Sequence, residues 1–130
     1  MADLLVIDDD LDGADALAEI LRTEGHVVRV GYNGEDGLRL ARERLPDMAL
    51  LDVEMPLLDG PGMAHQMFIH DMGMELVPVL LLSGAVNLRQ VAAAVGTPYF
   101  LGKPYRSEQI VTLANRALSE RTPPDPPPRT

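Results

Sequence analysis

Three separate apolar runs in this chain each stop at a polar residue, and this pattern constrains the fold more than any other feature. The runs are residues 4–7 before Asp8 and Asp9, residues 48–51 before Asp52, and residues 79–82 before Ser83; a shorter run, 99–101, leads into Gly102 and Lys103. Continuous apolar runs suit strands that are buried on both faces of a parallel sheet. Ligands of such sheets bind at the carboxyl ends of the strands, so one edge is expected to collect three carboxylates, a hydroxyl and an ammonium.

The segments between the runs alternate with them as helices. Apolar residues at helical spacing predict helices over residues 11–24, about 38–45, about 61–72, about 88–95 and about 107–118. Residues 27–30 are expected to form a short second strand, and the fourth strand is expected near 77–82. Gly25 and Gly96 are expected to end helices and Ser107 to cap one. Five βα units result, which predict an α/β fold with a five-stranded parallel sheet.

Length and composition leave room for one folded domain. The chain has 130 residues, of which 46% are hydrophobic, and this suits a single core of ordinary size. From Pro123 onward five residues of eight are proline, a composition that favours an extended segment. We expect a folded domain over residues 1–121 and a disordered proline-rich tail over 122–130, with a docked polyproline ligand as the alternative for the tail.

The charge balance and the missing cysteines exclude several functions. Eleven basic against 20 acidic residues give a formal net charge of −9, without a basic stripe, so direct binding of nucleic acid is not expected. The chain has no cysteine, which excludes disulfides and thiolate chemistry. Its apolar stretches are far shorter than the roughly 20 residues of a membrane helix, and Met1-Ala2-Asp3 is no signal start. We expect a cytoplasmic protein that does not enter the membrane.

The acidic edge indicates metal-assisted phosphoryl transfer. Three carboxylates held together favour a hard divalent cation, and Mg²⁺ prefers a few carboxylates with water and phosphate oxygens. Asp52 stands alone at its strand end and is the candidate nucleophile, while Asp9 is expected to bind the metal directly and Asp8 through water. Ser83 and Lys103 are expected to contact phosphoryl oxygens.

The matched motifs together are specific, and the chain resembles a response-regulator receiver domain of two-component signalling over roughly residues 3–120. They are the acidic pair in Val6-Ile7-Asp8-Asp9-Asp10, the acceptor motif from Leu51-Asp52 to Pro56 with Asp59-Gly60, Ser83-Gly84, and Phe100-Leu101-Gly102-Lys103-Pro104. The resemblance implies a doubly wound, flavodoxin-like and CheY-like fold with strand order 2-1-3-4-5. The spacing of apolar residues does not by itself determine this strand order.

The resemblance also implies the mechanism. Asp52 is expected to accept a phosphoryl group from a histidine of a partner kinase or histidine phosphotransfer protein, with Mg²⁺ held by Asp9, Asp52 and the backbone carbonyl of Glu54. Ser83 and Phe100 are the implied switch residues, and the surface of the fourth helix, fifth strand and fifth helix is the implied output for a downstream protein target. We therefore expect a signalling switch that is a monomer or becomes a dimer on activation. It is expected to assist its own phosphorylation and dephosphorylation and otherwise not to be an enzyme.

Other interpretations of the same residues stay open. Asp8 and Asp9 precede a helix, where acidic residues often serve only as caps. A metal-dependent phosphatase with Asp52 as nucleophile would need a general acid, for which Glu54 is the nearby candidate. A receiver-shaped interaction module that is never phosphorylated is the third hypothesis. The three histidines show no ligand spacing and are interpreted as surface residues, and the methionines as packing residues.

Overall fold

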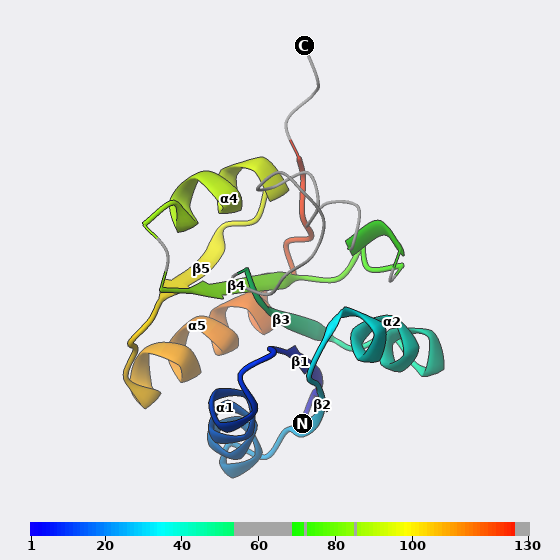
Figure 1. The fold of residues 1–130 in the computed structure, drawn as a ribbon, viewed down its shortest axis with the longest axis vertical. Coiled ribbons are helices and arrows are strands. Elements are labelled where there is room, and N and C mark those ends of the chain that lie inside the picture. Colours follow the sequence, from blue (N-terminus) through cyan, green and yellow to red (C-terminus); the bar gives the residue numbers. More distant parts are fainter. Residues whose placement is uncertain (54–68, 72, 85, 127–130) are drawn as a thin grey trace.

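The computed structural model describes residues 1–53, 69–71, 73–84 and 86–126, in which strands and helices alternate along the chain (Figure 1). The strands are β1 (Asp3–Ile7), β2 (Val27–Gly31), β3 (Met48–Asp52), β4 (Val79–Ser83) and β5 (Tyr99–Gly102). The helices are α1 (Leu11–Thr23), α2 (Gly34–Glu43), α4 (Leu88–Val95) and α5 (Ser107–Glu120). The helix expected over about 61–72 lies outside the described residues, apart from 69–71, which are helical.

The five strands form one sheet in the order β2-β1-β3-β4-β5, and every neighbouring pair is parallel. The predicted doubly wound parallel sheet with order 2-1-3-4-5 is therefore confirmed. In the described residues β1, β2, β4 and β5 are each followed by a helix, and a parallel strand pair needs such a crossover connection. All the strands therefore end at the same edge of the sheet, which is where the polar residues follow.

Helices cover the sheet on both faces: α1 and α5 on one, α2 and α4 on the other (Figure 1). Alternate residues of β1 point to opposite sides, so that Leu4 and Val6 pack with α1 and α5 while Leu5 and Ile7 pack towards α2 and α4. Burial on both faces explains why the strand sequences are continuous apolar runs. Truncating one of these buried leucines to alanine would cost about 2–5 kcal/mol of stability.

Glycines end two of the helices as predicted. Gly25 follows α1 with φ +90°, and Gly96 follows α4 with φ +80°, a left-handed conformation that residues with a side chain rarely adopt. Asn33 is the N-cap of α2, and its side-chain oxygen accepts a hydrogen bond from the Asp36 N–H at 2.8 Å. None of the described helices has the length and apolar composition needed to cross a membrane.

The start of α5 differs from the expectation. Ser107 was expected to cap this helix, but it is the first helical residue, and Arg106 occupies the N-cap position. The Arg106 N–H donates a hydrogen bond to the Gln109 side chain at 2.8 Å. The Gln109 side chain, and not a serine cap, thus satisfies a backbone donor at the start of the helix. After α5, residues 121–126 form neither helix nor strand.

Candidate functional site

The candidate site lies at the carboxyl edge of the sheet because the strand register aligns the strand ends. Ile7 pairs with Leu51, so the next residues along the chain are Asp8, directly after β1, and Asp52, the last residue of β3. On the other side of β3, Ser83 of β4 pairs with Gly102 of β5, directly before Lys103. The register thus brings together four segments that span the whole sequence, and it does so through backbone pairing rather than through the polar side chains themselves.

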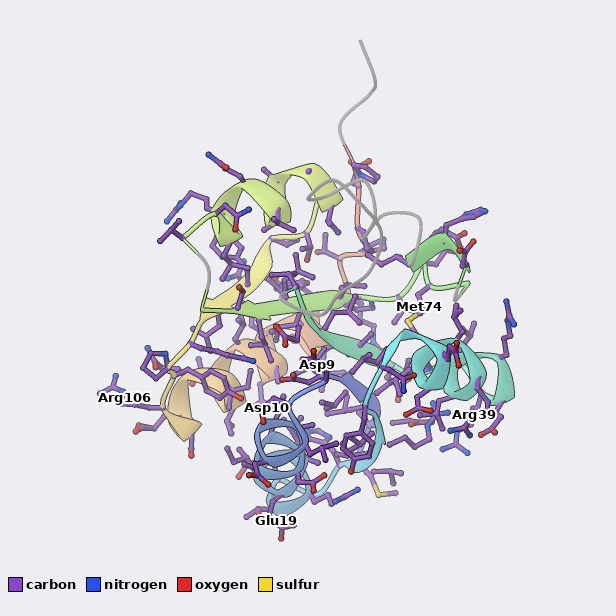
Figure 2. All side chains as sticks on the ribbon, viewed as in Figure 1. Asp9, Asp10, Glu19, Arg39, Met74 and Arg106 are labelled. Atoms are coloured by element: carbon purple, nitrogen blue, oxygen red, sulfur yellow. The ribbon has the colours of Figure 1, made fainter. Side chains whose placement is uncertain are left out.

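Three carboxylates meet at this edge. Asp8, Asp9 and Asp52 each offer one oxygen, and these oxygens all lie within 4.8 Å of one another. Asp8 and Asp52 are buried, with 3% and 2% of their surface exposed, whereas Asp9 is exposed; Figure 2 shows Asp9 where β1 gives way to the loop before α1. The arrangement therefore has two buried anionic groups with a third at the mouth.

The loop that carries the acidic pair is held by backbone contacts. The Asp8 N–H donates to the Gly31 carbonyl at 3.1 Å, which extends the pairing of β1 with β2 by one residue. Asp8 Oδ1 accepts a hydrogen bond from the Asp10 N–H at 2.9 Å, and Asp10 is the N-cap of α1. Asp10 makes no side-chain capping bond and lies at the helix start, as Figure 2 shows. These contacts fix the direction of the Asp8 carboxylate.

Lys103 joins the two buried carboxylates. Its Nζ lies 3.2 Å from Asp8 Oδ2 and 3.6 Å from Asp52 Oδ2, and its side chain is 25% exposed. Its backbone N–H donates to the Ser83 carbonyl at 2.8 Å, which anchors the lysine to the end of β4. One ammonium shared by two buried carboxylates compensates part of their charge.

The donor set fits a divalent cation. Counting only the described residues, the three carboxylates when ionised and the Lys103 ammonium together carry a net charge of −2 in a partly buried place, which a bound cation would offset. All three carboxylate ligands are oxygens, the type that Mg²⁺ prefers, and the exposed position of Asp9 leaves space for water or phosphate oxygens. Among the described residues this is the group of acidic or histidine side chains that is placed to hold a metal ion.

Ser83 and Phe100 occupy the positions that the sequence indicated. Ser83 is 1% exposed at the end of β4, next to Leu82, the residue that pairs with Asp52. Phe100 is half-buried on β5 and packs against the core on the α2 and α4 side. The Arg89 guanidinium of α4 lies 5.7 Å from the centre of the Phe100 ring, a cation–π contact that sequence reasoning missed. Nothing in the local sequence distinguishes Arg89 from other exposed helix residues.

Tyr105 is a second neighbour of the site that sequence reasoning missed. Its burial raises the pKa of the phenol above its ordinary value; the Lys103 charge lowers that pKa and the Asp8 charge raises it. The ring packs against the core on the α1 and α5 side. The sequence position of Tyr105, two residues after Lys103, could have indicated this, because both residues follow β5 at the same edge of the sheet.

Some predicted site features lie outside the described residues. They are the Glu54 carbonyl, implied as a metal ligand, and the motif residues Pro56, Asp59 and Gly60. His65, interpreted as a surface residue, lies outside the described residues as well. The two described histidines are away from the carboxylates: His26 Nδ1 accepts a hydrogen bond from the Ala2 N–H at 3.2 Å, and His70 pairs with Glu75. Their interpretation as residues outside the site agrees with these contacts.

A parallel α/β domain with an acidic pocket and a lysine at the strand ends is the class of protein that this geometry defines. The chain matches the family model of the response regulator receiver domain over residues 4–115. The response regulator MprA of Mycobacterium sp. (strain KMS) is 34% identical over 124 residues, which are 94% of this chain and 52% of MprA. The chain therefore belongs to the response-regulator receiver domains of two-component systems.

Two further comparisons place the chain within this family. The transcriptional regulatory protein PrrA of Mycobacterium tuberculosis is 33% identical over 120 residues, covering 91% of this chain and 50% of PrrA. The crystal structure of NtrX from Brucella abortus superposes with a TM-score of 0.80 at 32% identity, over 92% of this chain and 28% of NtrX. The chain thus spans about half the length of the curated relatives it matches.

Proposed function

We propose that this receiver is a phosphorylation-dependent switch, in which Asp52 accepts a phosphoryl group from a phosphohistidine on a partner kinase or phosphotransfer protein. The bond between phosphorus and the histidine nitrogen breaks as a bond to an Asp52 oxygen forms, which gives an acyl phosphate and frees the imidazole. The observation that carries the proposal is the pair of buried carboxylates, Asp8 and Asp52, bridged by Lys103 with Asp9 beside them. The cytoplasm is the compartment we propose for this exchange.

Each side chain has a separate task in the proposed transfer. Asp9 and Asp52 would hold Mg²⁺ directly and Asp8 through water, and the ion would supply positive charge to the phosphoryl oxygens. Asp52 supplies the attacking oxygen from its buried position. Lys103 lies within reach of both buried carboxylates and is placed to stabilise the charge that spreads over the equatorial oxygens during transfer. Ser83 offers its hydroxyl to the bound phosphoryl group.

In the proposed switch, a structural change passes from Ser83 to the surface formed by α4, β5 and α5, which binds the downstream protein. Ser83 and Phe100 lie at the end and in the middle of neighbouring strands, β4 and β5, so a shift of one is transmitted through packed backbone. Phosphorylation would bias an existing equilibrium between two arrangements of this face, which then binds a downstream protein as a monomer or as an activation-dependent dimer. Phe100 has no phenolic hydroxyl, so its position depends on packing and on the Arg89 contact.

The test is incubation with magnesium and a small-molecule phosphodonor, followed by intact mass measurement. The wild-type chain is expected to gain one labile phosphoryl group, and Asp52→Ala to gain none. Asp10→Asn is the matched control, because Asp10 is the neighbouring acidic residue at the N-cap position of α1 and is not part of the carboxylate group. This variant is expected to be phosphorylated like the wild type.

Two other outcomes would decide for the competing functions. Sustained hydrolysis of a phosphomonoester that depends on Asp52 would identify a phosphatase. Absence of any adduct with both the small donor and a panel of phosphorylated kinases would identify a receiver-shaped module that binds partners without phosphorylation. Either result would contradict the proposed switch.

A further inference from the structure

The segment after α5 contacts the end of the molecule that lies away from the acidic site. The Asp125 N–H donates a hydrogen bond to the Gly96 carbonyl at 2.9 Å, and Gly96 is the residue that ends α4. Figure 1 shows the segment in orange to red, running from the end of α5 past the end of α4. A segment predicted from its prolines to be a free tail therefore contacts the folded domain at a defined residue.

Gly96 is shaped for this contact as well as for its own backbone conformation. A Cβ atom at residue 96 would lie 2.0 Å from the Asp125 carbonyl oxygen and 2.1 Å from its carbonyl carbon. Gly25 has a similar φ of +90°, but a Cβ there would meet nothing within 4 Å. At Gly25 glycine serves only the left-handed conformation. At Gly96 the missing side chain also makes the room in which Asp125 lies.

A second contact fastens the segment closer to α5. The Tyr99 ring is fully buried at the start of β5, and its hydroxyl donates to Glu120 Oε1 at 2.9 Å. The Thr122 N–H donates to the same hydroxyl oxygen at 3.4 Å, a longer bond. Arg116 supports this arrangement, since its guanidinium lies 5.4 Å from the Tyr99 ring centre and 3.2 Å from Glu120. The segment therefore leaves α5 along a prepared polar contact.

The residues between the two contacts favour an extended backbone. Pro123 and Pro124 are half-buried, and proline restricts the unfolded segment, so less conformational entropy is lost when it docks. The turn between α4 and β5 is held by hydrogen bonds: Thr97 is buried, its hydroxyl donates to the Val79 carbonyl, and the same hydroxyl oxygen accepts from the Tyr99 N–H at 3.2 Å. A segment restricted by proline thus contacts a turn that is held by hydrogen bonds.

We propose that residues 122–126 form a strap that fastens the end of α4 and the start of β5 to the end of α5. The strap makes the far end of α4 a fixed pivot. The other end of α4 begins at Leu88, shortly after Ser83, and is left to move when the site is occupied. The consequence for switching rests on the proposed function: the strap limits the phosphorylation-dependent change to the half of α4 near the site, and its release would extend the change to the whole helix.

The strap itself is tested by amide hydrogen exchange of the full chain, measured by NMR. The Asp125 amide is expected to exchange at least about ten-fold more slowly than a free amide of the same sequence, because it is hydrogen-bonded. Gly96→Ala should abolish this protection. Gly25→Ala is the matched control, since it introduces the same backbone strain without touching the segment, and it should leave Asp125 protected. An unprotected Asp125 amide in the wild type, or equal effects of both variants, would overturn the proposal.

A second pair of variants covers the case in which Gly96→Ala does not fold. Asp125→Pro removes the N–H donor, whereas Asp125→Ala keeps it, and the Asp125 side chain is exposed in either case. Trypsin cleavage between Arg121 and Thr122 reports release of the strap. Cleavage is expected to be several-fold faster in Asp125→Pro and unchanged in Asp125→Ala. Equal cleavage rates in the two variants would contradict the strap.

The link to switching is tested separately with magnesium and a phosphodonor. In the wild type the NMR shift changes in α4 should concentrate near Leu88, and in Asp125→Pro they should reach Val95. Shift changes spread equally along α4 in both proteins would refute the pivot. The intact mass of the same samples shows whether the phosphoryl group has been transferred at all. Without an adduct the proposed function and the pivot fall, while the exchange experiment still decides whether the strap exists.

Discussion

The two edges of the sheet handle acidic side chains in opposite ways. At the amino edge each carboxylate has its own cation: Asp3 pairs with Arg29 at 3.3 Å and with Arg44, and Asp47 lies 3.9 Å from Arg121. At the carboxyl edge, within the part of the chain that the structure describes, the Lys103 ammonium pairs with two of the three site carboxylates, Asp8 and Asp52. The difference indicates that the amino-edge charges serve stability, whereas under the proposed function the carboxyl-edge charges serve metal binding and phosphoryl transfer.

The largest expected effect is a division of roles within the carboxyl edge. Lys103→Ala should slow phosphorylation of Asp52 by about 100-fold or more, because it removes the cation placed to stabilise the transferring group. Its magnesium affinity should stay equal or rise, since a positive charge next to the metal site is lost. Asp9→Ala should lower magnesium affinity by at least about ten-fold, because it removes a ligand.

Intact mass kinetics and calorimetric magnesium titration measure these two quantities. Arg44→Ala is the control from the amino edge: it also removes a cation beside a carboxylate, yet it should change neither quantity. Equal losses of magnesium affinity in Lys103→Ala and Asp9→Ala would contradict the division of roles.

Magnesium itself should stabilise the fold through the carboxyl edge alone. At a free concentration about 100-fold above Kd, a ligand that binds only the folded state adds about 2.7 kcal/mol to the free energy of unfolding. Chemical denaturation with and without magnesium should show a gain of this size in the wild type and in Asp3→Asn. Under the same conditions Asp9→Asn should show a much smaller gain. A full gain in Asp9→Asn would place the metal elsewhere.

Neutralising one carboxylate should change stability in opposite directions at the two edges when magnesium is absent. Asp3→Asn should lower the free energy of unfolding by about 2 kcal/mol, because it weakens the contact to the half-buried Arg29 and to Arg44. Asp9→Asn should raise the midpoint of thermal unfolding, because it relieves repulsion among three carboxylates. Destabilisation by both variants to a similar extent would remove the contrast between the edges.

The smallest expected effect is a change in the titration of Tyr105. The raised pKa of Tyr105 means that above pH 10.0 the unfolded chain loses the phenolic proton before the folded chain does. The Tyr105 contribution to stability is therefore complete below pH 10.0 and is lost as the pH rises through the folded-state pKa. Asp8→Asn should lower the pKa of Tyr105 and Lys103→Ala should raise it, as the two charges act in opposite directions.

Tyrosinate absorbance follows this titration, and Tyr105→Phe assigns the signal, which is needed because hydrogen bonding to Asp15 raises the pKa of Tyr32 as well. Shifts of the same sign in Asp8→Asn and Lys103→Ala would show that Tyr105 does not sense the site charges.

The sequence predicted the parts of the molecule that depend on repeating apolar patterns. Strands buried on both faces must be apolar throughout, so the run before Asp8 and the run before Asp52 indicated both the strands and the polar edge that follows them. Once the strand ends share an edge, Ser83 and Lys103 join the same place because each follows a run of its own. The parallel α/β architecture and the residues expected at its polar edge were predictable for this reason, whereas the strand order was implied by the family resemblance.

The remaining features depend on which side chain reaches which neighbour in space. The residue type favoured Ser107 over Arg106 as the cap of α5. Local sequence does not specify at which residue the extended backbone turns helical, and here the helix begins at Ser107 itself. The Arg89 contact with Phe100 joins two elements whose relative position only packing sets. The composition of the proline-rich segment indicated an extended chain, but not that Asp125 would lie on Gly96.

The central proposal is that the acidic carboxyl edge makes Asp52 a phosphoryl acceptor. Reductive trapping of the acyl phosphate with borohydride, followed by peptide sequencing in the mass spectrometer, locates the modified residue directly. We predict modification at Asp52 alone, dependent on magnesium. Modification at Asp8 or Asp9 in the wild-type chain, or at a carboxylate of the amino edge, would contradict the account.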